Sequence, residues 1–189
     1  MKENPAMPQE TVLEAEELRN AFGKFTTGVT IVTTQGTDGN AYGAMVTAFA
    51  AVSVDPPLAQ ITLTRSSRAA KHLDGSSFAI NILSVDQLEV AGHFAGQPMA
   101  SEPEWDLAGN VPVLRGNAAT LECRAWNNYD GGDHIIVVGE VRALTMGDSD
   151  PLIFHEGTFH RLGERLEAGR PESWFAGAKF FQPLVPQHH

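Results

Sequence analysis

Two short segments of this chain carry side chains suited to hold a charged ligand. Ser66, Ser67 and Arg68 stand in one run, where two hydroxyls and a guanidinium can converge on a phosphate group. Backbone N–H groups of a short helix that begins there would add donors. His134 follows the turn residues 131–133, and a histidine beside an acid can orient a ligand or stabilise negative charge. Ordinary alternatives remain for both segments, namely a helix start with a surface arginine and a surface histidine.

A third segment, residues 41–53, is rich in small residues and is predicted to form one strand. Gly43 and the neighbouring alanines would let a planar ring lie against this strand. The N–H groups of Met45, Val46 and Thr47, together with the Thr47 hydroxyl, could then meet polar atoms at the edge of the ring. The alternative is a tightly packed strand with no ligand.

Several familiar signatures are missing from the sequence. It contains neither the G-x-G-x-x-G pattern of a Rossmann domain nor a Walker A sequence, and no G-x-S-x-G elbow of a serine hydrolase. The segment HEGTFH (155–160) is one residue too long for the zinc-protease motif, and its glycine suits a turn better than a helix. We therefore expect no metal site.

The composition narrows the class of protein further. The formal net charge is -10 with only 13 lysines and arginines in 189 residues, which opposes nucleic-acid binding because such binding relies on clustered cations. The single Cys123 excludes an intrachain disulfide and fits a reducing cytoplasm, where we expect a buried structural thiol. Neither a signal peptide nor a run of ~20 apolar residues is evident, so we expect no membrane contact.

The elements that position these residues are mostly short strands. We expect helices over 11–25, 67–73 and 84–94, the first and last opening with capping boxes, and strands over 29–34, 41–53, 58–64, 78–83, 118–129, 134–145, 153–155 and 158–162. Hairpin connections without βαβ alternation favour an antiparallel, closed or partly closed barrel. The irregular segment 96–116, with an exposed Trp105, is a candidate lid.

An ordered set of motifs resembles a known family. The segments are FTTGVTIV (25–32), YGAMVTAF (42–49), SVDPP (53–57), SSR (66–68), FAIN (78–81), AATLEC (118–123) and GDHIIVVGEV (132–141). They resemble the flavin reductase family with the FMN-binding split barrel, in the family's order and over roughly residues 18–163.

The resemblance implies a mainly β, antiparallel split β-barrel with a few peripheral helices, and an NAD(P)H-dependent flavin reductase that supplies reduced flavin to a partner monooxygenase. It implies FMN or FAD held at a homodimer interface, with NADH or NADPH as co-substrate. His134 is the candidate catalytic residue, and the candidate cofactor-binding residues are Met45, Val46, Thr47, Ser53, Ser66, Ser67, Arg68, Ala79 and Asn81. We expect a flexible N-terminus (1–12), a split-barrel domain (13–165) and a C-terminal extension (166–189).

Two other functions fit the same sequence. One is a split-barrel flavoprotein that keeps its flavin and oxidises or reduces another small molecule, as relatives of pyridoxamine-phosphate oxidases do. The other is a flavin-binding dimer without turnover. Only a reductase would consume NADH rapidly when free flavin is added.

Overall fold

The computed structural model of this chain describes residues 13–73, 75–109 and 111–164. The predicted flexible N-terminus and C-terminal extension lie outside the described residues. Within these ranges the fold is mainly β, and every pair of neighbouring strands is antiparallel. The prediction of a mainly β, antiparallel fold is therefore confirmed.

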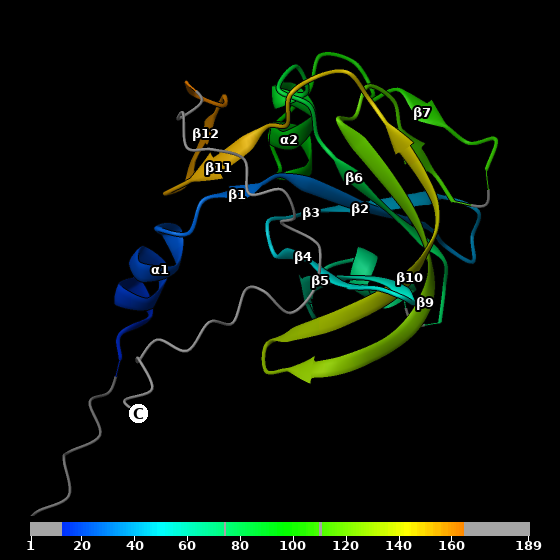
Figure 1. Cartoon of the computed structure of the whole chain (residues 1–189), viewed down its shortest axis with the longest axis horizontal. Helices are drawn as coiled ribbons and strands as arrows, with labels where there is room; N and C mark the ends of the chain where they lie inside the picture. Colours follow the sequence, from blue (N-terminus) through cyan, green and yellow to red (C-terminus); the bar gives the residue numbers. More distant parts are fainter. Residues whose placement is uncertain (1–12, 74, 110, 165–189) are drawn as a thin grey trace, which may run out of the picture.

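The largest sheet has seven strands in the order β3-β2-β6-β9-β10-β5-β4 (Figure 1). Its strands are β2 (Thr30–Gln35), β3 (Ala41–Val46), β4 (Phe49–Val54), β5 (Pro57–Thr64), β6 (Phe78–Ile82), β9 (Ala119–Gly131) and β10 (His134–Met146). The sheet curls strongly, so that β3 and β5 approach each other although neither is the other's neighbour in the sheet. A core cluster that includes Val32, Ile61 and Phe78 fills the concave side.

The prediction of one continuous strand over 41–53 is wrong. The chain bends at Thr47 and Ala48, so that β3 pairs with β2 while β4 pairs with β5 at the opposite edge of the sheet. The Ala48 carbonyl accepts a hydrogen bond from the Thr62 N–H (3.0 Å), which ties the bend to β5. The run of small residues in the sequence did not indicate a bend at this point. Between β4 and β5 the chain turns at residues 55–56, and Pro57 is the first residue of β5, where a missing N–H is tolerated.

The helices are shorter than the sequence predicts. The first, α1 (Ala15–Gly23), begins after a capping box formed by Glu14 and Glu17, whereas the predicted cap Thr11 lies outside the described residues. The second, α2 (Leu88–Phe94), follows a turn in which the Ser84 N–H donates to Gln87 Oε1 (2.9 Å). The predicted helix over 67–73 is a single 3₁₀ turn, η1 (Ala69–His72).

The candidate lid packs against the body of the protein. It contains a small two-stranded sheet of β7 (Trp105–Asp106) and β8 (Val113–Leu114). The Leu114 side chain is buried, and Trp105 is half-buried, with its ring edge-on to Phe94 at 6.4 Å between centroids. The Thr33 hydroxyl also donates to the Pro112 carbonyl (2.5 Å). Trp105 is therefore not the exposed side chain that we predicted, because apolar and polar contacts both hold this segment down.

The predicted hairpin connections are confirmed at residues 37–40, 130–133 and 156–157. Strands β9 and β10 form a long hairpin whose turn places Gly132 at a φ of 75°, in the left-handed region that glycine adopts readily. A separate three-stranded sheet joins β1 (Thr27–Gly28) to the hairpin of β11 (Ile153–His155) and β12 (Thr158–His160). This second sheet lies beside α1 (Figure 1).

Asn81 is the centre of a polar network inside the fold. Its side chain has no exposed surface and donates to the Ile31 carbonyl (2.8 Å) and the Thr33 hydroxyl (3.0 Å). Its Oδ1 accepts hydrogen bonds from the Leu114 N–H and from Asn117 Nδ2, each at 3.0 Å. The network joins β2, β6 and the β8 segment, so every hydrogen-bonding site on this buried amide has a partner within the chain.

Candidate functional site

A hollow of about 730 Å³ lies where the bend after β3, the segment before η1 and the β9–β10 turn meet. This volume is typical of a small-molecule site. Its wall combines apolar side chains with hydroxyls, one guanidinium and one imidazole. Of the predicted site residues, it brings together Met45, Val46, Thr47, Ser67, Arg68 and His134.

The strand wall of the hollow is built around Gly43. A Cβ atom at this position would lie only 2.4 Å from Cε1 of Phe94, so any larger residue would force the Phe94 ring to move. We expected the small residues of this strand to make room for the ring of a ligand. At Gly43 the ring is instead that of Phe94, which projects from α2 and lines the same hollow.

Arg68 is the cation of this hollow. Its side chain is exposed and forms no ion pair with any residue that the structure describes. The hydroxyl of Ser67 accepts the Ala70 N–H (3.1 Å), and Ser66 is exposed beside them but does not line the hollow. Because η1 is a single 3₁₀ turn, the ability of this segment to bind an anion rests on the Arg68 guanidinium and on the hydroxyls rather than on a helix terminus.

His134 stands at the start of β10, at the rim of the hollow. Its Nδ1 lies 2.6 Å from Oδ1 of Asp133, and 37% of its side chain is exposed. The hydrogen bond from His134 lowers the pKa of the Asp133 carboxyl below its ordinary value. Asp133 therefore remains a carboxylate at neutral pH and fixes one nitrogen of the ring. Nε2 has no protein partner among the described residues.

The hollow also contains residues that sequence reasoning did not single out. Thr62 and Thr64 lie on β5, and Ile136 lies on β10 two residues after His134. Alternate residues of a strand share one face, so the period of two on β5 and β10 was the signal that could have found them. Phe94 carried no such signal, because its position depends on how α2 packs against β3.

Four predicted cofactor-binding residues lie outside the hollow, and the first of them is Ser66, described above. Ala79 and Asn81 are completely buried in β6, where Asn81 has the four hydrogen bonds described above. Ser53 lies on the edge strand β4, paired with Leu58. The structure thus gives Ala79 and Asn81 a place in the core instead of a surface for a ligand.

The histidine pair at 155 and 160 lies on the β11–β12 hairpin. The centroids of the two rings are 6.1 Å apart, and each ring forms a hydrogen bond with a threonine hydroxyl. His155 Nδ1 bonds with Thr26 (2.9 Å), and His160 Nε2 bonds with Thr158 (2.8 Å). Across the described residues, no group of three or more His, Cys, Asp or Glu side chains is placed to hold a metal ion. No helix in the same part of the chain has the length and hydrophobicity needed to cross a membrane.

Comparison with known proteins identifies the family to which a chain with this site belongs. Residues 22–163 match the family described as the flavin reductase like domain, a range that includes every residue lining the hollow. The chain belongs to this flavin reductase family. The family match covers both walls of the hollow and the β9–β10 turn, but not the last 26 residues, 164–189.

Three members of the flavin reductase family show how close the likeness is. The FMN reductase (NADH) SmoA of Agrobacterium fabrum is 39% identical over 167 residues, covering 84% of this chain and 95% of SmoA. The reductase component of the flavin-dependent trigonelline monooxygenase of Acinetobacter baylyi is 35% identical over 79% of this chain, which matches 50% of that longer protein. Among solved structures, the flavin reductase PheA2 in its native state superposes with a TM-score of 0.76 at 33% identity, covering 80% of this chain and all of PheA2.

Proposed function

We propose that this protein is an NAD(P)H:flavin oxidoreductase that transfers a hydride from NADH or NADPH to FMN or FAD. The observation that carries the proposal is the hollow itself, which combines an apolar strand wall, a partly exposed histidine and a guanidinium that has no ion pair among the described residues. The name of SmoA, an FMN reductase that uses NADH, supports the same reaction. No Rossmann fingerprint is present in the sequence, so the nicotinamide nucleotide would bind without that domain.

The residues of the hollow fit a flavin. In an acidic protein, Arg68 offers a cation that no protein carboxylate occupies among the described residues, and Ser66 and Ser67 add hydroxyls beside it. These three residues would hold the phosphate, while Met45, Val46 and Thr47 would contact the ring. When bound, the flavin and the nicotinamide supply the redox chemistry.

The protein's own contribution would be orientation and electrostatics. His134, held through Nδ1 by Asp133, would orient the nicotinamide or stabilise negative charge on the reduced flavin. Ala79 and Asn81 would contribute indirectly by fixing β6 against β2, and Ser53 stands apart on the edge strand.

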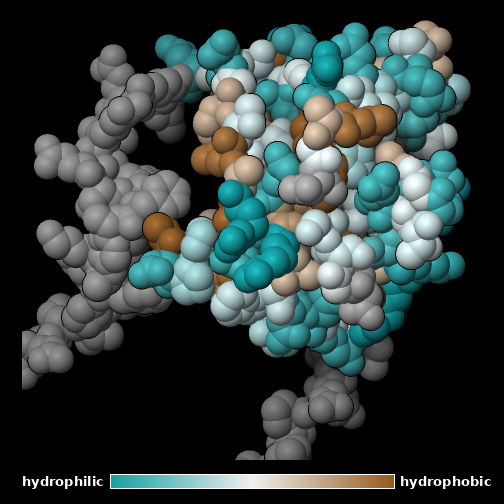
Figure 2. Space-filling view, turned by 90° about the vertical axis from the view of Figure 1, so that its right-hand side faces the viewer, coloured by the Kyte–Doolittle hydropathy of each residue, from teal (hydrophilic) through white to brown (hydrophobic). Residues whose placement is uncertain are grey.

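We further propose that the curled sheet is one half of a split-barrel homodimer, with the flavin between the two copies. The helix α1 has no buried residue. Phe22 near its end is 71% exposed, and Phe25, two residues beyond the helix, is 78% exposed. Phe22 borders both the hollow and a second cavity of about 790 Å³ beneath α1. On the face shown in Figure 2, apolar residues form only small separate patches, so α1 and its surroundings are the better candidate for the interface.

A partner and a compartment follow from the same proposal. The Acinetobacter relative is the reductase component of a flavin-dependent monooxygenase, which supports an oxygenase partner that receives the reduced flavin. The single cysteine, which can form no intrachain disulfide, supports a location in the reducing cytoplasm.

One mixing experiment tests the reaction. NADH or NADPH is added to the full chain in air, with and without free FMN, FAD or riboflavin, and the loss of absorbance at the nicotinamide band is followed. Rapid oxidation that needs added free flavin supports the reductase. Oxidation that depends on a flavin retained through gel filtration would indicate the flavoprotein alternative, and flavin binding without oxidation would indicate a non-catalytic dimer.

A second experiment, sedimentation at micromolar concentration, tests the proposed homodimer. A monomer that still binds flavin would contradict it.

A further inference from the structure

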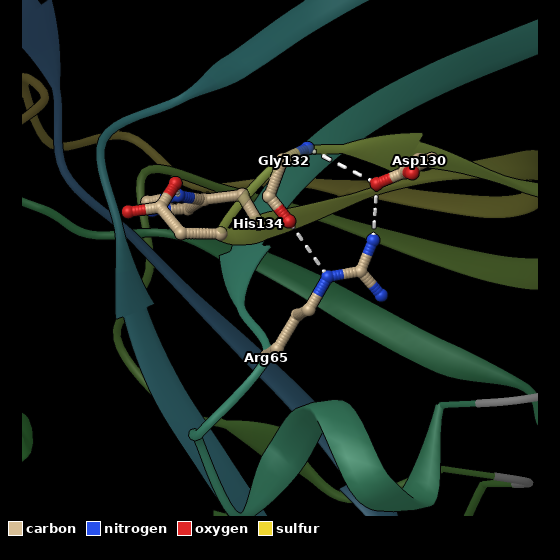
Figure 3. Close-up of polar contacts among 5 residues, drawn as sticks. Arg65, Asp130, Gly132 and His134 are labelled. Atoms are coloured by element: carbon tan, nitrogen blue, oxygen red, sulfur yellow. Dashed lines mark hydrogen bonds and ion pairs between the residues drawn. The ribbon is translucent and has the colours of Figure 1, made fainter.

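Arg65 occupies the position between the two polar parts of the hollow. It is the first residue after β5, directly following Thr64 and directly preceding the 66–68 segment. Its side chain does not line the hollow but extends to the β9–β10 turn, as Figure 3 shows. Two segments that are distant in sequence, the anion-binding segment and the turn that carries His134, therefore meet at this one side chain.

The contacts of Arg65 enclose the turn. Its Nε donates to the Gly132 carbonyl (2.8 Å), and its Nη2 forms an ion pair with Asp130. Asp130 Oδ1 also accepts the Gly132 N–H (3.1 Å), so the three residues form a closed ring of hydrogen bonds (Figure 3). The Arg65 backbone N–H donates to the Asp133 carbonyl (3.1 Å), immediately before His134. We call this set of contacts the Arg65 clamp.

The turn needs such a restraint because of its composition. Gly131 and Gly132 are adjacent and exposed, and glycine has the largest conformational freedom of any residue. The Gly132 N–H and the Arg65 guanidinium lower the pKa of Asp130 below its ordinary value, which keeps this carboxylate charged at neutral pH.

Global stability is a weak explanation for the clamp. The side chains of Arg65 and Asp130 are 47% and 82% exposed, and ion pairs exposed to this degree add little to the stability of a fold because water and salt screen them. Two directed bonds from one planar guanidinium to a carboxylate and a carbonyl do, however, define the orientation of a small turn.

We propose that Arg65 is a positioning residue for His134. The clamp fixes the β9–β10 turn, and with it the imidazole, at a constant place relative to Arg68 and the rest of the hollow. The effect of Arg65 on the reaction therefore passes through His134. This last step rests on the proposed function, whereas the restraint of the turn does not.

The restraint is tested without any ligand, by amide hydrogen exchange of the full chain followed by mass spectrometry. In Arg65→Ala we expect residues 130–135 to exchange at least about tenfold faster, because local opening of the turn is no longer opposed by the clamp. The matched control is Arg124→Ala, which removes another exposed guanidinium from an ion pair on the same hairpin, the pair with Glu140. Equal exchange of the turn in Arg65→Ala and wild type would overturn the proposal, and equal urea midpoints show that both variants fold.

The link to His134 is tested by a double-mutant cycle on the rate of flavin reduction in anaerobic stopped-flow. We expect Arg65→Ala to slow reduction about fivefold in the wild-type background, with little change in the affinity for oxidised flavin, and to have almost no effect in His134→Ala. The same factor in both backgrounds would overturn the proposal, as would a His134→Ala variant that reduces flavin at the wild-type rate. If the wild-type protein reduces no flavin, the proposed function fails, and the exchange experiment still decides whether Arg65 restrains the turn.

Discussion

Two polar groups of this molecule lie at opposite ends of the burial scale: the Asn81 amide inside the sheet and the Asp133–His134 pair at the rim of the hollow. Asn81 has no exposed surface and four hydrogen bonds, all within the chain. His134 is partly exposed, with one nitrogen held by Asp133 and the other without a partner in the described part of the chain.

The number of hydrogen-bonding sites that each group leaves free distinguishes a structural role from a binding role better than the residue type does. A buried polar group whose capacity is fully used within the chain stabilises the fold and has nothing left for a ligand. A group at a rim that keeps a donor or acceptor in reserve is available for binding. Arg68 belongs with His134 by this criterion, because no described carboxylate pairs with it, whereas Arg65 and Arg124 are paired.

The largest effect is expected from breaking the interior group. Asn81→Ala removes the partner of the Ile31 carbonyl and of the Leu114 N–H in the core, and it leaves the Thr33 hydroxyl with its bond to Pro112 alone. Since each buried group that loses its partner costs ~1–3 kcal/mol, we expect the free energy of unfolding to fall by roughly 3–5 kcal/mol. Urea denaturation measures it. Asn40→Ala, at an exposed turn, is the control and should stay within ~0.5 kcal/mol. A loss below ~1 kcal/mol in Asn81→Ala would contradict the comparison.

The next effect concerns Arg68. Arg68→Ala should weaken FMN binding by roughly 1.5–3 kcal/mol, because a charge-assisted hydrogen bond to the phosphate is lost, while riboflavin, which lacks the phosphate, is barely affected. Fluorescence titration of both flavins measures this, with Arg142→Ala as a control, since its guanidinium pairs with Glu140. Equal losses for the two flavins would return Arg68 to a structural role.

The sequence predicted the secondary-structure elements better than it predicted the tertiary contacts of individual side chains. Glycine positions marked the β9–β10 and β11–β12 hairpins correctly, because backbone conformation there is a local property. The bend at Thr47 was missed, because it depends on β4 pairing with β5 across the curled sheet. The sequence marked Asn81 as a candidate cofactor-binding residue, and only tertiary structure shows that Ile31, Leu114 and Asn117 supply its side chain with hydrogen-bond partners inside the fold. In the same way Gly43 was predicted to leave room for the ring of a ligand, and only the fold shows that the Phe94 side chain lies against this glycine.

At His134, on the rim of the hollow, we expect a smaller effect, which is confined to the rate of flavin reduction. His134→Ala should slow flavin reduction about tenfold, or ~1.4 kcal/mol, while the affinity for oxidised flavin is nearly unchanged, since an interaction made mainly in the transition state lowers the chemical rate without equal loss of binding. Anaerobic stopped-flow at saturating NADH separates the two quantities. An unchanged reduction rate would make His134 a surface residue, and loss of folding or of dimers would make it structural.

The smallest effect on activity is expected at Cys123, which is 2% exposed and packs in the same core cluster as Phe78. Burial raises the pKa of its thiol to about 12, so the reactive thiolate is scarce at pH 8 and iodoacetamide should leave both the thiol and the reductase rate unchanged. The thiol then reports on the interior. Alkylation should accelerate in Asn81→Ala, whose core opens more often, and should stay slow in His134→Ala, whose change is confined to the rim. Rapid alkylation of the folded wild-type protein, or loss of activity after alkylation, would show that Cys123 is accessible to solvent. It would then be wrong to count Cys123 among the buried structural groups.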